Sequence, residues 1–215
     1  MNTGIILAGG IGSRFGADKP KQYCKILGKE MILYSIDAFK SAKKIDDFIV
    51  VLDKEQFEKG EIASKYNVKT VLGGSSRNAS FKNALDYIAK NYPTCEKIVE
   101  NNAACPMITS EVLDKYMSFL DEYDYVETAF KITDALGAYD KRDCDREDFY
   151  LIQAPDAYRF KLLYKYFDSE SPLCHPAQQL PKSTKGYQYF DYGANYKVTY
   201  PYDLEIVEIL MKNKK

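Results

Sequence analysis

Glycines and cations cluster near the start of the chain, directly after a short apolar run. The segment Leu7-Ala8-Gly9-Gly10 is followed by Gly12, Arg14 and Lys21. Small residues let the backbone turn tightly and approach a ligand, and their N–H groups can surround an anion. Cations without a candidate nucleophile indicate phosphoryl chemistry that depends on positioning and charge stabilisation. The segment therefore predicts a polyphosphate site, and the alternative is an ordinary glycine turn after a strand.

Two better-known glycine loops do not match this segment. A P-loop needs Gly-x-x-x-x-Gly-Lys-Ser/Thr, and that string is absent from the sequence. The dinucleotide fingerprint Gly-x-Gly-x-x-Gly fits Gly10 and Gly12 but fails at Phe15. The segment Pro20-Lys21-Gln22-Tyr23 follows closely, and together with Arg14 it favours the phosphate site over the ordinary turn.

A second glycine turn lies at Gly73-Gly74-Ser75, and Arg77 and Ser80 follow it. Ser80 is of a residue type that can cap the helix expected after the turn. A base or ribose could lie against the glycine backbone while Arg77 secures the loop. The alternative is the start of a helix with ordinary capping residues.

Asn102 follows the fourth expected strand, where a magnesium-dependent transferase needs an acid. Hard cations prefer charged oxygen ligands, whereas Asn102 offers only a neutral carbonyl. Glu100 stands too early in the segment to replace that acid. A plain loop before a helix is therefore a serious alternative to a metal site.

Three further residues with possible chemistry are isolated in the sequence. Lys197 stands in an expected strand, where a solvent-facing lysine at a sheet edge is the alternative to a functional one. Arg146 stands in a charge-rich stretch and is by default a surface residue. His175 is the only histidine, has no recognisable triad or zinc partners, and is expected to be a loop residue.

Strand and helix patterns alternate through the first part of the chain. The expected strands cover residues 5–7, 48–52, 68–72 and 98–100, and the expected helices cover residues 32–39, 57–66, 80–89 and 110–120. This alternation predicts a doubly wound α/β fold with a mostly parallel sheet. Ligands bind such sheets beyond the carboxyl ends of the strands. The loops at residues 9–14, 73–77 and 101–106 all follow carboxyl ends and should therefore converge on one crevice.

The alternation weakens after residue 127. Residues 129–132 are compatible with a strand, whereas 134–148 are polar, charged and too numerous for a plain turn, so we interpret them as a protruding arm. The pattern resumes with a helix at 158–166, a strand at 196–199 and a helix at 201–210. Pro201 suits the first turn of that last helix, where its missing N–H costs nothing.

Composition limits the classes of function. A chain of 215 residues fits one domain, and its formal net charge of -1 argues against a general nucleic-acid binder. No apolar run is long enough for a membrane span and no signal peptide is recognisable, so we expect a cytoplasmic protein. The five cysteines lack zinc-ligand spacing and are expected to be reduced.

Together these segments resemble the cytidylyltransferases that act on sugar-alcohol phosphates, over almost the whole chain. The two glycine segments are similar to the family's nucleotide loops, and Lys197-Val198-Thr199 with Pro201 and Asp203-Leu204 is similar to its C-terminal signature. The resemblance implies a nucleotidyltransferase Rossmann-like fold with a dimerisation arm. It favours the ribitol phosphate type over the methylerythritol phosphate type.

The resemblance implies a reaction between CTP and a polyol phosphate that gives a CDP-alcohol and pyrophosphate. Arg14 and Lys21 would stabilise charge on the attacked phosphate and the departing pyrophosphate. Lys197 would hold the incoming phosphate, and Arg146 would assist, in the partner subunit's site of a homodimer. Mg²⁺ would be bound largely through the nucleotide.

The sequence departs from the family pattern on the acceptor side. Asn102 stands where the family has a metal-binding aspartate, and Cys105 stands where it has an arginine. A later Thr-Asp pair is replaced near Cys174-His175. Two readings stay open: the acceptor differs, or metal handling and catalysis are weakened. A non-catalytic nucleotide-binding protein is the alternative to an enzyme.

Overall fold

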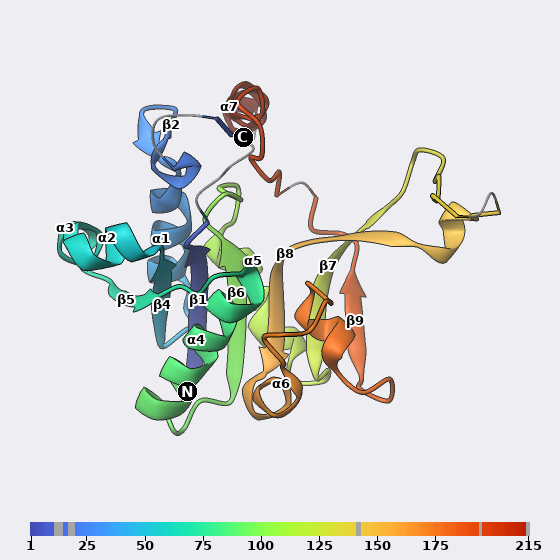
Figure 1. Ribbon diagram of the computed structural model, residues 1–215, viewed down its shortest axis with the longest axis horizontal. Coiled ribbons are helices and arrows are strands. Elements are labelled where there is room, and N and C mark those ends of the chain that lie inside the picture. Colours follow the sequence, from blue (N-terminus) through green and yellow to red (C-terminus); the bar gives the residue numbers. More distant parts are fainter. Residues whose placement is uncertain (11–14, 17–19, 141–142, 194, 214–215) are drawn as a thin grey trace.

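The computed structural model describes residues 1–10, 15–16, 20–140, 143–193 and 195–213. Over these residues the chain forms a seven-stranded sheet with helices on both faces (Figure 1). The strands in spatial order are β5 (Lys69–Leu72), β4 (Asp47–Leu52), β1 (Asn2–Ala8), β6 (Lys97–Asn102), β8 (Tyr150–Arg159), β7 (Tyr125–Lys131) and β9 (Gly186–Tyr189). The expected α/β fold with a mostly parallel sheet is confirmed.

The first four strands of that order are parallel to one another, whereas β8 runs antiparallel to both β6 and β7. The helices are α1 (Met31–Ser41), α2 (Lys54–Lys59), α3 (Glu61–Tyr66), α4 (Arg77–Asn91), α5 (Ser110–Phe119), α6 (Phe160–Tyr166) and α7 (Asp203–Asn213). Short 3-10 turns are η1 (Lys21–Tyr23), η2 (Arg146–Asp148) and η3 (Pro176–Gln179), and β2 (Lys25–Ile26) and β3 (Lys29–Glu30) form a small hairpin.

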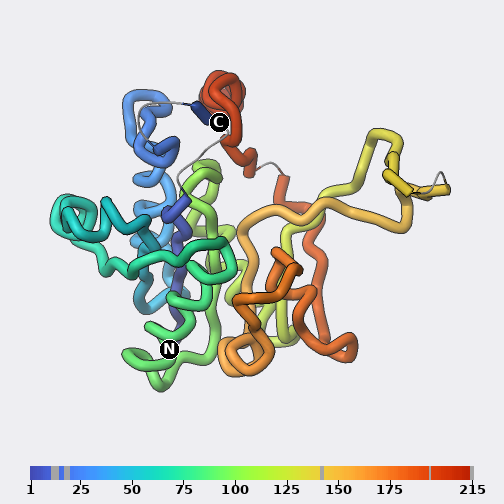
Figure 2. The backbone as a smooth tube through the Cα atoms, viewed as in Figure 1, coloured from blue at the N-terminus to red at the C-terminus, as the bar shows by residue number. Residues whose placement is uncertain are grey.

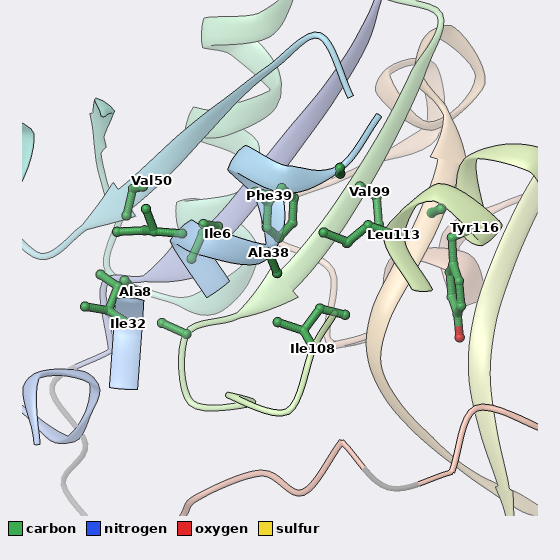
Figure 3. Packing of buried hydrophobic residues seen from close by; sticks show 14 of the residues in the cluster. Ile6, Ala8, Ile32, Ala38, Phe39, Val50, Val99, Ile108, Leu113 and Tyr116 are labelled. Atoms are coloured by element: carbon green, nitrogen blue, oxygen red, sulfur yellow. The ribbon is translucent and has the colours of Figure 1, made fainter. Parts of the chain in front are cut away.

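Alternating side chains of the central strands build one hydrophobic core on each face of the sheet. Ile6 and Val50 pack with Phe39 of α1 and Leu113 of α5 on one face (Figure 3). On the other face, their neighbours such as Ile5 pack against α4 and α6. All four residues of 49–52 are buried, as expected for a parallel strand covered on both sides.

Several element boundaries differ from the sequence predictions. The helix expected at 57–66 is two helices, because Gly60 (φ 67°) adopts the left-handed conformation that ends α2. Tyr158 and Arg159 belong to β8 and not to the following helix. Residues 196–199 form no strand, and α7 begins at Asp203, after Pro201. The strand β9 was not predicted.

The chain between β7 and β8 projects from the body as an arm (Figures 1 and 2). The two strands pair antiparallel as far as Lys131 and Tyr150, and η2 lies in the chain beyond them. Phe149, directly after η2, and Leu151, in the first part of β8, are 48% and 53% exposed. Among the described residues, none of the helices is long and apolar enough to cross a membrane.

Candidate active site

A cavity of about 490 Å³ lies at the carboxyl ends of β1 and β6, beside the loop that follows β5. The loops expected to converge there do so. The sequence-predicted residues that line it are Leu7, Ala8, Gly9, Gly10, Lys21, Gly74, Ser75, Arg77, Ser80, Asn102 and Lys197. Gln22, Ser76, Ala103, Ala104 and Thr199 complete the described lining. Arg14 lies outside the described residues.

Gln22 holds the first glycine turn from inside the protein. Its side-chain amide donates to the carbonyl oxygens of Ala8, at 2.7 Å, and Gly10, at 3.2 Å, and the residue is 2% exposed. The amide therefore fixes the two ends of the turn relative to each other. The sequence motif contained Gln22, but nothing in its spacing indicated this inward contact.

Two lysines bring positive charge to the cavity. Lys21 donates from Nζ to the carbonyl oxygen of Val198 at 2.8 Å, so η1 contacts the segment that carries Lys197. That segment is held by the N–H of Val198, which donates to the Ala104 carbonyl oxygen at 2.9 Å. The Asp203 carboxylate accepts from the backbone N–H of Thr199 at 2.6 Å. These contacts replace the strand pairing that the sequence suggested and still place Lys197 at the cavity.

The second glycine turn is closed by side chains from the first turn of α4. Ser76, and not Ser80, caps that helix, because its Oγ accepts from the Ala79 N–H at 3.0 Å. Ser80 Oγ instead accepts from the Gly74 N–H at 3.0 Å. A Cβ on Gly74 would lie 2.5 Å from the Ala79 Cβ, so only glycine fits here. Gly73 does not line the cavity within the described residues, but its N–H donates to the Leu52 carbonyl oxygen at 2.7 Å.

Arg77, the first residue of α4 after this turn, has a partner that the sequence did not reveal. Its guanidinium forms an ion pair with Glu100 and donates to the Cys174 carbonyl oxygen at 3.0 Å. Glu100 is fully buried on β6. Burial raises the pKa of this carboxyl to about 7, although the Arg77 charge acts in the opposite direction.

The described residues do not form a metal site of their own. No group of three His, Cys, Asp or Glu side chains with suitable geometry occurs in the described part of the chain. The described lining includes no carboxylate, and Asn102 contributes one amide group. The described lining therefore offers a magnesium ion no charged oxygen ligand.

Three other predicted residues lie away from the cavity walls. Arg146 lies on the arm, where its guanidinium contacts the Thr133 carbonyl oxygen and Glu147; within the described structure it does not line the cavity of its own chain. Cys105 is buried beneath the cavity, and burial raises the pKa of its thiol to about 12. His175 lies in a loop, as predicted, but is buried between two carboxylates.

The family model described as "IspD: 2-C-methyl-D-erythritol 4-phosphate cytidylyltransferase" matches residues 3–213. The chain belongs to this family. The match confirms the resemblance to sugar-alcohol phosphate cytidylyltransferases that the motifs indicated.

The names of two relatives refer to different sugar alcohols, methylerythritol and ribitol. The 2-C-methyl-D-erythritol 4-phosphate cytidylyltransferase of Thermosipho melanesiensis is 29% identical over 175 residues, 78% of this chain and 77% of the relative. The bifunctional ribulose 5-phosphate reductase/CDP-ribitol pyrophosphorylase Bcs1 of Haemophilus influenzae is 30% identical over 178 residues, 78% of this chain. The match spans only 37% of the length of that bifunctional protein.

A solved structure shows the same fold. The 4-diphosphocytidyl-2C-methyl-D-erythritol synthase of Anaerococcus prevotii superimposes with a TM-score of 0.83 at 23% identity, covering 99% of this chain and 96% of that one. At this identity the likeness concerns the fold alone.

Proposed function

We propose that this enzyme joins CTP to a polyol phosphate and releases pyrophosphate and a CDP-alcohol. The observation that carries the proposal is a single cavity that collects both glycine turns together with Lys21 and Lys197. Such a cavity supplies backbone N–H groups and cations to a polyphosphate, the two features that phosphoryl transfer by positioning requires. The family match supports the nucleotide and the class of acceptor.

The acceptor is itself the nucleophile. A phosphate oxygen of the polyol phosphate attacks the α-phosphorus of CTP, and the bond between that phosphorus and the oxygen bridging to the β-phosphate breaks. The electron pair leaves with pyrophosphate, so no covalent enzyme intermediate is required. Lys21, together with Arg14, stabilises the charge on the α-phosphate and the leaving group, and Lys197 holds the acceptor phosphate.

Mg²⁺ has a secondary role in the proposed reaction. When bound with the nucleotide, Mg²⁺ neutralises charge on the phosphates. Asn102 lies at the cavity as one weak oxygen ligand, because an amide oxygen lacks the net charge that favours dehydration of the ion.

The proposed acceptor is a ribitol phosphate-like polyol phosphate, with methylerythritol phosphate as the alternative. The glycine segments and the segment 201–204 favour the ribitol phosphate type. The Haemophilus influenzae relative, whose name includes CDP-ribitol pyrophosphorylase, supports this choice.

We further propose that the enzyme is a cytoplasmic homodimer in which the arm brings Arg146 to the partner subunit's site.

A pyrophosphate-release assay tests the function directly. Purified enzyme with Mg²⁺ is supplied with CTP, UTP, ATP or GTP, each against ribitol 5-phosphate, methylerythritol phosphate and glycerol phosphate. Release with CTP and one polyol phosphate is expected. A CTP-dependent rise in melting temperature without release from any pair would mean a nucleotide-binding protein that does not catalyse transfer.

A further inference from the structure

Three acidic side chains lie directly opposite one another on neighbouring strands behind the second glycine turn. Glu100 of β6 pairs with Asp156 of β8, and Asp156 also pairs with Glu127 of β7. All three residues are at most 2% exposed. Like charges at directly opposed positions destabilise a sheet, and buried carboxylates are costly without partners. The arrangement therefore needs compensation from other groups.

Two cations provide that compensation. The Arg77 guanidinium pairs with Glu100 at one end of the row. The imidazole of His175 lies between the other two acids, with Nε2 3.1 Å from Asp156 Oδ2 and Nδ1 3.5 Å from Glu127 Oε2. Burial alone would lower the pKa of His175, but the neighbouring carboxylates outweigh it and the pKa is raised. We refer to these five side chains as the charged row.

The charged row is electrically neutral when Glu100 carries a proton and His175 is protonated. Glu100 Oε2 and Asp156 Oδ1 have no hydrogen-bond donor in the described structure. Burial raises the pKa of Glu100 to about 7, and a proton on this carboxyl can hydrogen-bond to Asp156. Two negative charges then face the charges of Arg77 and protonated His175, which accounts for burial of the whole set.

The row is connected to the nucleotide cavity through the start of α4. Arg77 lines the cavity and is 33% exposed at its side chain. Its guanidinium also holds the Cys174 carbonyl oxygen, and the Asn78 side-chain amide donates to the carbonyl oxygens of Ser171 and Leu173 at 3.1 and 3.0 Å. The start of α4 and residues 171–175 are therefore held together, with Glu100 behind them.

We propose that Glu100 is a positioning residue for nucleotide binding, which fixes the Arg77 guanidinium at the cavity and with it the start of α4 that follows the second glycine turn. Glu100 does not line the cavity in the described structure, so its effect on the nucleotide passes through Arg77. Without Glu100, the guanidinium keeps only its contact with the Cys174 carbonyl oxygen among the hydrogen bonds described above, and the start of α4 loses its ion pair with β6. This inference rests on the proposed function, because it assumes that the cavity binds CTP.

The test compares two isosteric variants of the row. Glu100→Gln removes the acid that touches Arg77, and Glu127→Gln removes an equally buried acid at the far end. CTP affinity is measured by titration calorimetry without acceptor, kcat and KM by pyrophosphate release, and unfolding free energy in urea. At pH 8, where Glu100 is mostly ionised, Glu100→Gln replaces a charged acceptor of Arg77 by a neutral amide oxygen and should weaken CTP binding about tenfold. The kcat at saturating CTP should change less than about twofold, because the loss concerns binding rather than the transition state.

A double-mutant cycle separates positioning from general destabilisation. If Glu100 acts through Arg77, then Glu100→Gln should have no further effect on CTP affinity in an Arg77→Ala background. Glu127→Gln should change the unfolding free energy with a much smaller change in CTP affinity.

Different failures have different meanings. Absence of CTP binding by the unmodified enzyme would overturn the proposed function itself. Normal CTP binding by folded Glu100→Gln, or equal weakening by both Gln variants, would overturn the positioning role alone. If Glu100→Gln does not fold, Glu100→Asp keeps the charge but withdraws it from Arg77, and unchanged CTP affinity in that variant would also overturn the proposal.

Discussion

Lys21 is the described residue that we expect to contribute most to catalysis. It reaches the cavity from η1 and contacts the segment that carries Lys197. Lys21→Ala should lower kcat by about two to three orders of magnitude, the usual effect of losing one preorganised charge contact. Arg14→Ala should have a similar effect. Pyrophosphate release at saturating CTP measures this, with the exposed neighbour Lys25→Ala as control. A loss of only a few-fold in folded Lys21→Ala would contradict the role.

Asn102 gives a prediction about magnesium. Because no carboxylate occurs in the described lining, the enzyme should need a high magnesium concentration, and Asn102→Asp should lower it. Magnesium titrations of both proteins at saturating CTP give the half-maximal concentrations. An unchanged or higher requirement in Asn102→Asp would show that another acid already serves the ion, since a further carboxylate then adds only surplus negative charge.

His175 makes stability depend on pH. Because its pKa is raised in the folded protein, the native state binds this proton more tightly than the unfolded chain. The stabilisation is full below the ordinary histidine pKa of about 6.5 and is lost as pH rises through the raised value. Urea unfolding should therefore show lower stability at pH 8 than at pH 6, and His175→Gln should reduce this difference. An equal difference in both proteins would assign it to other groups.

At the scale of elements, the second glycine turn requires glycine at position 74. A Cβ there would lie 2.9 Å from the Ala79 carbonyl carbon, which is backbone and cannot move aside freely. Gly74→Ala should lower the unfolding free energy by about 1–3 kcal/mol, as overpacking does, and weaken CTP binding. Gly137→Ala is a matched control, because an added Cβ meets no atom within 4 Å. Equal thermal stability of the two variants would contradict the steric argument.

The sequence predicted the elements whose residues follow simple periodic patterns. The strands β1 and β4 carry buried apolar runs, and α1 and α4 carry apolar side chains at helical spacing. The strand β8 was not predicted, because it buries Asp156 at a position where a strand pattern has an apolar residue. Residues 196–199 resembled a strand, but they are held by Asp203 and Ala104 instead.

The residues of the candidate site also divide into those that local sequence patterns reveal and those that depend on distant contacts. Glycines and lysines near strand ends were identifiable, because their conformational freedom and charge act locally. Gln22, Glu100 and the buried state of His175 depend on contacts with residues 12 to 48 positions away, which spacing along one chain does not encode.

At the scale of the whole molecule, the arm predicts a homodimer. Residues 134–140 and 143–148 lie in a segment that projects from the body. Phe149, which follows η2, and Leu151 in the first part of β8 are substantially exposed. Light scattering should give twice the mass of the chain, and Leu151→Asp should shift the protein toward monomer. Tyr164→Asp, at a similarly exposed aromatic away from the arm, is the control. A monomeric unmodified protein would also remove any role for Arg146 in a partner's site.

The electrical neutrality of the charged row restricts which substitutions at its five positions are tolerated during evolution. Loss of the charge of Arg77, His175 or Glu127 alone changes the buried net charge, whereas joint loss of Glu127 and His175 removes one charge of each sign and leaves the balance intact. Tolerated substitutions that remove a charge should therefore occur in pairs, one removing a positive and the other a negative side chain, with the second substitution following soon after the first. Because Arg77 also lines the cavity, its exchange should be slower than that of His175 and Glu127.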